Sequence, residues 1–254
     1  MDMKIALLTG ASSGLGRMFA HKIHTIFPEI DEVWVVARRL ERLNELKNEI
    51  KDVTITPIAA DITLEADRKA IFERVKEQQA EIALLINNAG CGFHGSFETS
   101  DLSEQERCIR LNVLALTQFT RSALDFMPKG ARILTTSSIA SFVPNANMAV
   151  YSASKAYTTF FSRALREELR SSHRSATAVC PAPMNTEFLT VGHVKGNSKT
   201  FDRLPYCDVE KVAIGALKAA KMRKAVYTPR AFYKFYRLLV RLLPDGLLVK
   251  MAKT

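Results

Sequence analysis

The chain has 254 residues, four scattered cysteines and a formal net charge of +10. A chain of this length can bury a full apolar core without disulfides, and the absence of a CxxC pair argues against a zinc ribbon or a redox dithiol. We find no signal-peptide pattern, no run of roughly 18 apolar residues that would span a membrane, and no metal-ligand spacing among the five histidines. We therefore expect a cytoplasmic protein without a metal ion.

The positive charge is concentrated near the end of the chain. Residues 211–254 contain eleven lysines and arginines but a single acid, Asp245, so the preceding residues balance to zero. Such a segment could meet anionic lipid, nucleic acid or an acidic partner, or it could be a solvated surface. We do not expect nucleic acid to be the partner.

Apolar, β-branched runs alternate with amphipathic stretches along the chain. The runs lie at 5–9, 33–37, 53–58, 82–86, 132–136, 177–180 and 225–227, and the amphipathic stretches lie near 15–27, 40–50, 64–79, 103–127, 152–171 and 208–221. Repeated strand–helix units predict an α/β fold, a Rossmann-type doubly wound parallel sheet of about seven strands with helices on both faces. We expect one domain over 1–254, with a substrate lid at about 187–206 and a C-terminal extension at 229–254.

A glycine-rich turn joins the first predicted strand to the first helix. Its sequence is Thr-Gly-Ala-Ser-Ser-Gly-Leu-Gly, with glycines at 10, 14 and 16. Glycines there allow the backbone to approach a pyrophosphate, which the helix N-terminus attracts. The spacing alone is a weak signal, and a plain tight turn is the alternative; its place between a strand and a helix favours a dinucleotide site.

The end of the second strand indicates which dinucleotide is preferred. Arg38 and Arg39 stand where an acid would bind the ribose 2′-hydroxyl of NAD. Two cations suit a 2′-phosphate, so we expect NADP(H) to be preferred over NAD(H), although the pair could simply face solvent. Asp61, after the third strand, could accept a hydrogen bond from adenine or cap the next helix.

Tyr151 and Lys155 are four residues apart on a predicted helix, so they share one face. An ammonium beside a phenol is expected to lower the tyrosine pKa from about 10, which would let the phenol exchange a proton near neutral pH. The pair is weak evidence by itself. Ser138 ends the fifth strand, where it could hold a substrate oxygen. Asn112 lies inside a helix, where it could mark a kink, hold a buried water, or have no role.

These motifs together resemble the short-chain dehydrogenase/reductase family, in its short single-domain form, over residues 4–228. The resemblance implies that Tyr151 is the general acid/base, that Lys155 holds the nicotinamide ribose, that Ser138 orients the carbonyl and that Asn112 supports a proton relay. It also implies a set of cofactor contacts. These are Gly10, Ser12, Ser13, Gly14, Leu15, Gly16, Arg38, Arg39, Asp61, Ile62, Asn88, Ala89, Gly90, Tyr151, Lys155, Pro181 and Thr186.

One position departs from the family pattern. The usual Pro-Gly after the sixth strand is Pro181-Ala182 here. If this position needs a positive φ, alanine costs on the order of 1 kcal/mol. We expect a reshaped turn near the nicotinamide rather than lost binding.

Residues 231–243 predict an amphipathic helix with a basic stripe, ended by the Pro-Asp-Gly at 244–246. Such a helix could lie in a membrane interface, cap the substrate pocket or pair with a second subunit. We favour packing within the protein or between subunits of a homodimer or homotetramer, and peripheral membrane contact stays open.

The function that this pattern favours is NADP(H)-dependent hydride transfer between nicotinamide and a ketone or secondary alcohol of a fairly apolar small molecule. A non-catalytic dinucleotide sensor or interaction protein on the same fold is the alternative, although it would not need Ser138, Tyr151 and Lys155 together. A sugar-nucleotide epimerase would need a longer C-terminal region. The substrate cannot be identified from the sequence.

Overall fold

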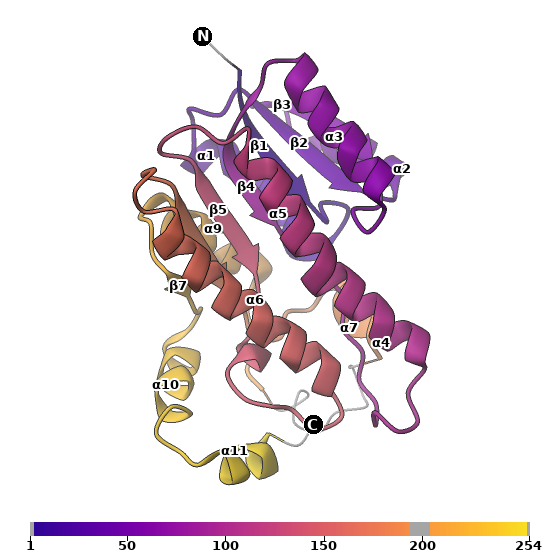
Figure 1. The fold of residues 1–254 in the computed structure, drawn as a ribbon, viewed down its shortest axis with the longest axis vertical. Helices are drawn as coiled ribbons and strands as arrows, with labels where there is room; N and C mark the ends of the chain where they lie inside the picture. The colour runs from indigo at the N-terminus through magenta and orange to yellow at the C-terminus, as the bar shows by residue number, and fades with distance from the viewer. Residues whose placement is uncertain (1–2, 194–203, 253–254) are drawn as a thin grey trace.

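Strands of the computed structural model, which describes residues 3–193 and 204–252, form one parallel sheet (Figure 1). Its order is β3-β2-β1-β4-β5-β6-β7. The strands are β1 (Lys4–Thr9), β2 (Glu32–Ala37), β3 (Thr54–Ala59), β4 (Glu81–Asn87), β5 (Arg132–Thr136), β6 (Ser175–Val179) and β7 (Val226–Tyr227). The predicted seven-stranded parallel sheet is confirmed.

Helices cover both faces of the sheet. They are α1 (Gly14–Ile26), α2 (Leu40–Glu49), α3 (Glu65–Glu77), α4 (Leu102–Ile109), η1 (Arg110–Ala115), α5 (Leu116–Leu124), η2 (Ile139–Ser141), α6 (Ala149–Glu168), α7 (Glu187–Val191), α9 (Val209–Lys221), α10 (Ala231–Leu239) and α11 (Asp245–Met251). Helices α3, α5 and α6 lie on one face, and α1, α2 and α9 on the other (Figure 1). This is the predicted doubly wound α/β arrangement.

Alternate residues of each strand pack into two cores, one on each face of the sheet. Leu8 packs in the core that contains Phe19, and Leu7 packs in the core that contains Phe119. Both leucines are fully buried, as successive side chains of a strand covered on both faces must be. The near-continuous apolar runs of the strands follow from this double burial.

The sheet order reverses between β1 and β4, which pair directly with each other. Chain connections leave β1 toward one edge of the sheet and β4 toward the other, so the loops at their carboxyl ends diverge. In open α/β sheets, this divergence opens a crevice beyond the carboxyl ends of the strands. Both the glycine-rich turn after β1 and the Asn-Asn-Ala-Gly segment after β4 lie at that crevice.

The single helix predicted over 103–127 is interrupted. Its central part, η1 (Arg110–Ala115), is a π-helix between α4 and α5. A π-turn inserts an extra residue into the helical turn and often accompanies a functional side chain. Asn112 lies within η1, so the helix is irregular at this asparagine, one of the alternatives considered from the sequence.

Two further predictions need correction or restriction. The amphipathic helix predicted over 231–243 ends at Leu239, and a second helix, α11, begins at Asp245, where we expected only a terminator. Pro244 is compatible with the residue before a helix, and an acid in the first turn favours a helix start. The irregular stretch predicted over 187–206 begins with the short helix α7, and its residues 194–203 lie outside the described residues.

Candidate active site

The turn between β1 and α1 needs its glycines for two different reasons. Gly10 and Gly14 have φ of +70° and +52°, a region that favours glycine. A Cβ on Gly16 would lie 2.0 Å from the carbonyl oxygen of Gly10, so no side chain fits there. No side chain caps α1, whose first turn contains no acid. Its first N–H groups are therefore available to an anion, and the turn fits a pyrophosphate.

The segment after β4 is held against this turn by hydrogen bonds. The backbone N–H groups of Asn88 and Ala89 donate to Thr9 Oγ1 at 3.1 and 3.2 Å. Asn88 Nδ2 donates to the Gly10 carbonyl at 3.1 Å. Sequence reasoning missed Thr9, whose signal is its place as the last residue of β1, directly before the glycine turn.

The two arginines after β2 line the same cavity but have different partners. Arg39 Nη2 lies 2.8 Å from Glu187 Oε2 and donates to Ser12 Oγ at 3.1 Å. Arg38 is mostly exposed, and its Nη1 lies 3.8 Å from Asp61 Oδ2. Glu187, the first residue of α7, was not predicted as a site residue.

Asp61 is neither a helix cap nor an unengaged acceptor. Its Oδ1 accepts hydrogen bonds from the N–H and the hydroxyl of Thr63 at 2.9 and 2.7 Å, while α3 begins later, at Glu65. This local turn replaces the helix cap considered from the sequence. It leaves Asp61 and Ile62 facing the cavity.

Tyr151 and Lys155 lie on the first turns of α6, and both side chains are buried. Lys155 Nζ donates to the Thr136 carbonyl at 3.0 Å and lies 5.8 Å from the centre of the Tyr151 ring. The Ser138 side chain is within hydrogen-bonding reach of the Tyr151 phenol. The structure thus brings the predicted Ser138, Tyr151 and Lys155 together.

Burial, rather than the nearby ammonium, dominates the protonation of this pair. The pKa of Tyr151 is raised above its usual value because the phenol is desolvated, an effect that the hydrogen bond from Ser138 only partly opposes. The same desolvation lowers the pKa of Lys155. The predicted lowering of the Tyr151 pKa by Lys155 is therefore wrong in this structure, since proximity on one helix face does not reveal burial.

Both the oxygen and the nitrogen of the Asn112 side-chain amide bind the backbone of Cys91, in the segment that follows β4. Its Oδ1 accepts from the Cys91 N–H at 3.0 Å, and its Nδ2 donates to the Cys91 carbonyl at 2.7 Å. Nδ2 also lies 3.0 Å from Ser154 Oγ and 3.2 Å from Cys108 Sγ. The buried amide therefore ties η1, the β4 end and α6 into one unit.

Two cysteines adjoin this amide. The pKa of Cys108 is lowered to about 7, chiefly by a hydrogen bond from the Cys91 thiol, and burial opposes the shift. Sharing the proton in this way raises the pKa of Cys91. Cys91 faces the cavity and Cys108 lies behind it. Cys108 was not singled out in the sequence, because only the fold brings it beside Cys91.

Gly92 is another residue that sequence reasoning missed. A Cβ at this position would lie 2.4 Å from Cδ2 of Tyr151, so the tyrosine ring packs directly on the backbone. Phe188 of α7 flanks the ring, with the ring centres 5.6 Å apart. The signal available in the sequence was a second glycine, Gly92, shortly after Gly90 at the end of the fourth strand, which indicates a close approach to the backbone.

The turn after β6 does not carry the strain considered for Ala182. Ala182 is absent from the described non-glycine residues with positive φ, so alanine costs nothing through a left-handed backbone. Its side chain is buried in the core that α9 covers. Pro181 and Thr186, on either side, both face the cavity.

A cavity of about 630 Å³ unites these features along the carboxyl ends of the strands. Every predicted site residue except Gly16 and Asn112 lines it, and those two support it from behind. The predicted lining residues are Gly10, Ser12, Ser13, Gly14, Leu15, Arg38, Arg39, Asp61, Ile62, Asn88, Ala89, Gly90, Ser138, Tyr151, Lys155, Pro181 and Thr186. The cavity has room and donors for a dinucleotide at one end and an apolar wall at the other.

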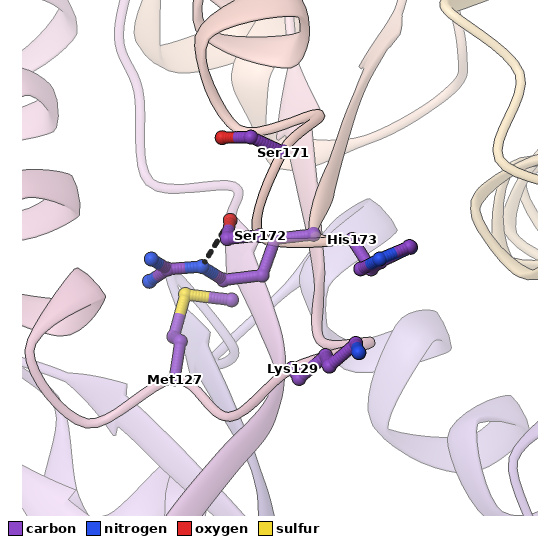
Figure 2. A pocket seen from close by; sticks show the side chains of 6 residues that line it. Met127, Lys129, Ser171, Ser172 and His173 are labelled. Carbon is purple, nitrogen blue, oxygen red and sulfur yellow. Dashed lines mark hydrogen bonds between the residues drawn. The ribbon is translucent and has the colours of Figure 1, made fainter.

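A second, smaller hollow of about 250 Å³ lies near the amino-terminal ends of β5 and β6 (Figure 2). Its lining residues directly precede β5 and β6: Met127, Lys129, Ser171, Ser172, His173 and Arg174. Within this lining, Arg174 Nε donates to Ser172 Oγ at 2.9 Å. Ligand crevices of open α/β sheets lie at the carboxyl ends of strands, so we do not assign this hollow to the reaction.

Comparison with known proteins identifies the family to which the chain belongs. The family model described as short chain dehydrogenase matches residues 4–192. The Bos taurus protein named dehydrogenase/reductase SDR family member 11 is 30% identical over 225 residues, which are 83% of this chain and 87% of that protein.

Solved structures share the whole architecture. A short-chain dehydrogenase from Sphingobium yanoikuyae in complex with NADPH matches with a TM-score of 0.80 at 30% identity, over 96% of this chain and 94% of that one. A 3-ketoacyl-(acyl-carrier-protein) reductase from Brucella melitensis complexed with NADH matches with a TM-score of 0.78 at 25% identity, over 90% and 97%. The chain belongs to the short-chain dehydrogenase/reductase family, whose members are oxidoreductases that act on CH–OH and C=O groups with NAD(P).

Proposed function

We propose that this protein is an NADP(H)-dependent oxidoreductase that transfers a hydride between nicotinamide and a ketone or secondary alcohol of a fairly apolar substrate. The observation that carries the proposal is the meeting of Tyr151, Ser138 and Lys155 at one wall of the cavity that the glycine-rich turn opens. A nicotinamide dinucleotide supplies the hydride or accepts it. The protein supplies the proton and the alignment.

Tyr151 is the proposed acid/base, because its phenol is the buried proton donor next to the Ser138 hydroxyl. In the reduction direction it donates its proton to the developing alkoxide, and Ser138 donates a hydrogen bond to the same oxygen. Lys155 is the proposed ligand of the nicotinamide ribose. Asn112 is a positioning residue, because its amide holds the backbone of Cys91. Its proposed place in a proton relay rests on the family resemblance.

The dinucleotide would lie along the cavity from the arginines to the tyrosine. Residues after β1 and at the start of α1 would hold the pyrophosphate, and the residues after β3 and β4 would flank adenine and its ribose. The proposed contacts are Gly10, Ser12, Ser13, Gly14, Leu15, Gly16, Asp61, Ile62, Asn88, Ala89 and Gly90, with Pro181 and Thr186 near the nicotinamide.

The proposed preference for NADP(H) rests on Arg38 and Arg39. Both face the cavity directly after β2, and no acid occupies that strand end to accept a ribose 2′-hydroxyl. Nη2 of Arg39 contacts Ser12 Oγ and Glu187 Oε2 at the edge of the cavity. A 2′-phosphate can take the place of the Glu187 carboxylate on the guanidinium, since both are anions that arginine binds through paired N–H groups.

The proposed substrate is apolar at its reacting end because the cavity wall around Tyr151 is apolar. Met148, Phe188 and Leu189 line that end, and Met148 and Leu189 are buried in one cluster with the Tyr151 ring.

We also propose one domain over residues 1–254 and self-association as a homodimer or homotetramer. Leu114 on η1 and Phe160 on α6 expose 52% and 68% of their surface. Beside these residues, Thr117 of α5 and Tyr157 of α6 have hydroxyl oxygens 2.6 Å apart. The exposed apolar face supports an interface. Four free cysteines support the proposed cytoplasmic location.

Replacement of Tyr151 by Phe tests the reaction. Loss of the proton donor should lower kcat by about 100-fold or more, whereas the Kd for NADPH should change less than about twofold. NADPH oxidation should be followed with steroid ketones, β-ketoacyl thioesters and aldehydes. Tyr157→Phe, which removes a phenol at the helix surface, is the matched control. Retained turnover in Tyr151→Phe would exclude the proposed role, and no turnover of the wild type on any carbonyl would favour a sensor.

A further inference from the structure

The contacts that attach the last two helices to the other described residues lie on one side of the pair. On α10, Tyr233 is buried and its hydroxyl donates to the Pro205 carbonyl at 2.8 Å. Val240 and Leu248 pack in a small cluster with Val143, which follows η2. In Figure 1, α10 and α11 (yellow) lie at the end of the molecule toward which β5 points. The pair is therefore anchored near the cavity, with its other side uncovered.

That uncovered side is apolar. Phe235 and Leu238 on α10 expose 63% and 58% of their surface, and Leu242 in the following turn exposes 75%. Phe235 and Leu238 follow Tyr233 by two and five residues, which turns them about 200° and 140° from it around the helix. They thus point away from the buried side. Exposed apolar groups concentrated in this way mark a surface that binds something.

Cations border the apolar side chains. Lys234, Arg241 and Lys250 are exposed, and none of the ion pairs among residues 3–193 and 204–252 includes them. The segment from residue 230 to 252 contains five lysines and arginines against one acid. An excess of unpaired positive charge beside exposed phenylalanine and leucine is the composition of helices that lie in a membrane interface.

We propose that α10, α11 and the turn between them dock the protein on an anionic phospholipid bilayer. We call this the basic–apolar surface; its members are Phe232, Lys234, Phe235, Leu238, Arg241, Leu242, Leu247, Val249 and Lys250. The apolar side chains enter the acyl boundary, and the cations bind the headgroup phosphates. Contact is peripheral, because no helix of the described ranges is long and apolar enough to cross a bilayer.

Charge distinguishes this occupant from a second copy of the chain. In a two-fold dimer through the same surface, Lys234, Arg241 and Lys250 would face the same cations of the partner, with one acid in the segment to offset them. An anionic bilayer meets both the apolar and the cationic groups. The anchoring of α10 through Pro205, and of Val240 through Val143, keeps the surface beside the segments that border the cavity.

Co-sedimentation of the full-length protein with vesicles tests this. Wild-type protein should bind phosphatidylcholine vesicles containing phosphatidylglycerol, bind pure phosphatidylcholine weakly, and lose affinity as salt rises. The variant Lys234→Gln/Arg241→Gln/Lys250→Gln should bind anionic vesicles roughly 100-fold more weakly, at about fivefold per cation. Its matched control, Lys47→Gln/Lys51→Gln/Lys76→Gln, removes three exposed lysines elsewhere and should bind like the wild type.

A second variant tests the apolar contribution. Phe235→Ser/Leu238→Ser should lower binding to anionic vesicles at least tenfold, whereas Leu64→Ser/Met222→Ser, which changes two exposed apolar residues elsewhere, should not. Both variants should keep the wild-type melting temperature and activity on a water-soluble ketone. No binding by the wild type, or unchanged binding by either surface variant, would refute the proposal. A changed oligomeric state in light scattering would instead assign the surface to a second copy.

Discussion

Replacing Glu187 by Gln removes the carboxylate that forms an ion pair with Arg39, one of the two arginines proposed to bind the 2′-phosphate. Arg39 Nη2 lies 2.8 Å from Glu187 Oε2, and the two side chains are 46% and 43% exposed. An ion pair this exposed contributes about 0.2–1 kcal/mol to stability. Most of that contribution is lost when NADPH binds, because the 2′-phosphate has to displace the Glu187 carboxylate from Arg39. Repulsion between the carboxylate and an incoming phosphate adds up to about 1 kcal/mol in a solvated site. The substitution should therefore tighten NADPH binding by about 1 kcal/mol, or roughly fivefold.

Binding of NADPH and NADH should be measured by titration calorimetry at fixed ionic strength. Glu187→Gln should change the Kd for NADH less than twofold, since NADH carries no 2′-phosphate. Arg39→Ala should weaken NADPH roughly tenfold through loss of a charged hydrogen bond, and Glu187→Gln should have no further effect in that background. Glu49→Gln, which changes an exposed ion pair with Arg17, is the matched control.

Two results would refute this reasoning. Equal tightening of NADPH and NADH would mean that Glu187 acts on the shape of the cavity rather than on the 2′-phosphate. Weaker NADPH binding by Glu187→Gln would mean that the carboxylate holds Arg39 in its binding position. The gain should also shrink as salt rises, because screening weakens the repulsion that the substitution removes.

Three other substitutions or conditions have definite expected outcomes. Gly16→Ala should lower the free energy of unfolding by about 1–3 kcal/mol in urea, because its Cβ would lie 2.0 Å from a carbonyl oxygen, whereas Gly246→Ala, with no atom within 4 Å, should not. Asn112→Ala should cost about 2–4 kcal/mol by leaving the backbone of Cys91 unpaired, and should lower kcat in steady-state assays. Because burial raises the pKa of Tyr151, kcat/KM for ketone reduction should show no loss up to about pH 10, while alcohol oxidation should rise with pH.

The sheet could be predicted from the sequence because its signals are local. The central strand β1 is buried on both faces, so its residues Ile5–Leu8 are all apolar. Strand β5 has the predicted bounds, although only Ile133 and Leu134 of its five residues are apolar. The boundary of β6 was less well predicted, since it begins at the polar Ser175, whose burial depends on its neighbours. The site followed from the fold, because residues that end strands of one parallel sheet must converge.

Contacts between distant segments could not be predicted from residue spacing. Glu187 is 148 positions from Arg39, and no local pattern links the acid to the arginine. Cys108 Sγ lies 3.5 Å from the Cys91 carbonyl oxygen, a contact across 17 positions that no local pattern reveals. The pKa of Tyr151 depends on how completely the folded protein excludes water, which is a property of the assembled cavity.

Helix α7 connects the two ends of the cavity through consecutive residues. Glu187 binds Arg39 at the proposed cofactor end, Phe188 packs against the Tyr151 ring, and Leu189 is buried in the same cluster as that ring. Because these three residues are consecutive in one short helix, a displacement of the helix backbone moves all three side chains. We therefore expect that a 2′-phosphate that shifts α7 as it displaces Glu187 from Arg39 also moves the wall of the proposed substrate pocket. The shape of that pocket should then depend on which dinucleotide is bound. The contact between Arg39 and Glu187 would in that case influence both the choice of cofactor and the choice of carbonyl substrate.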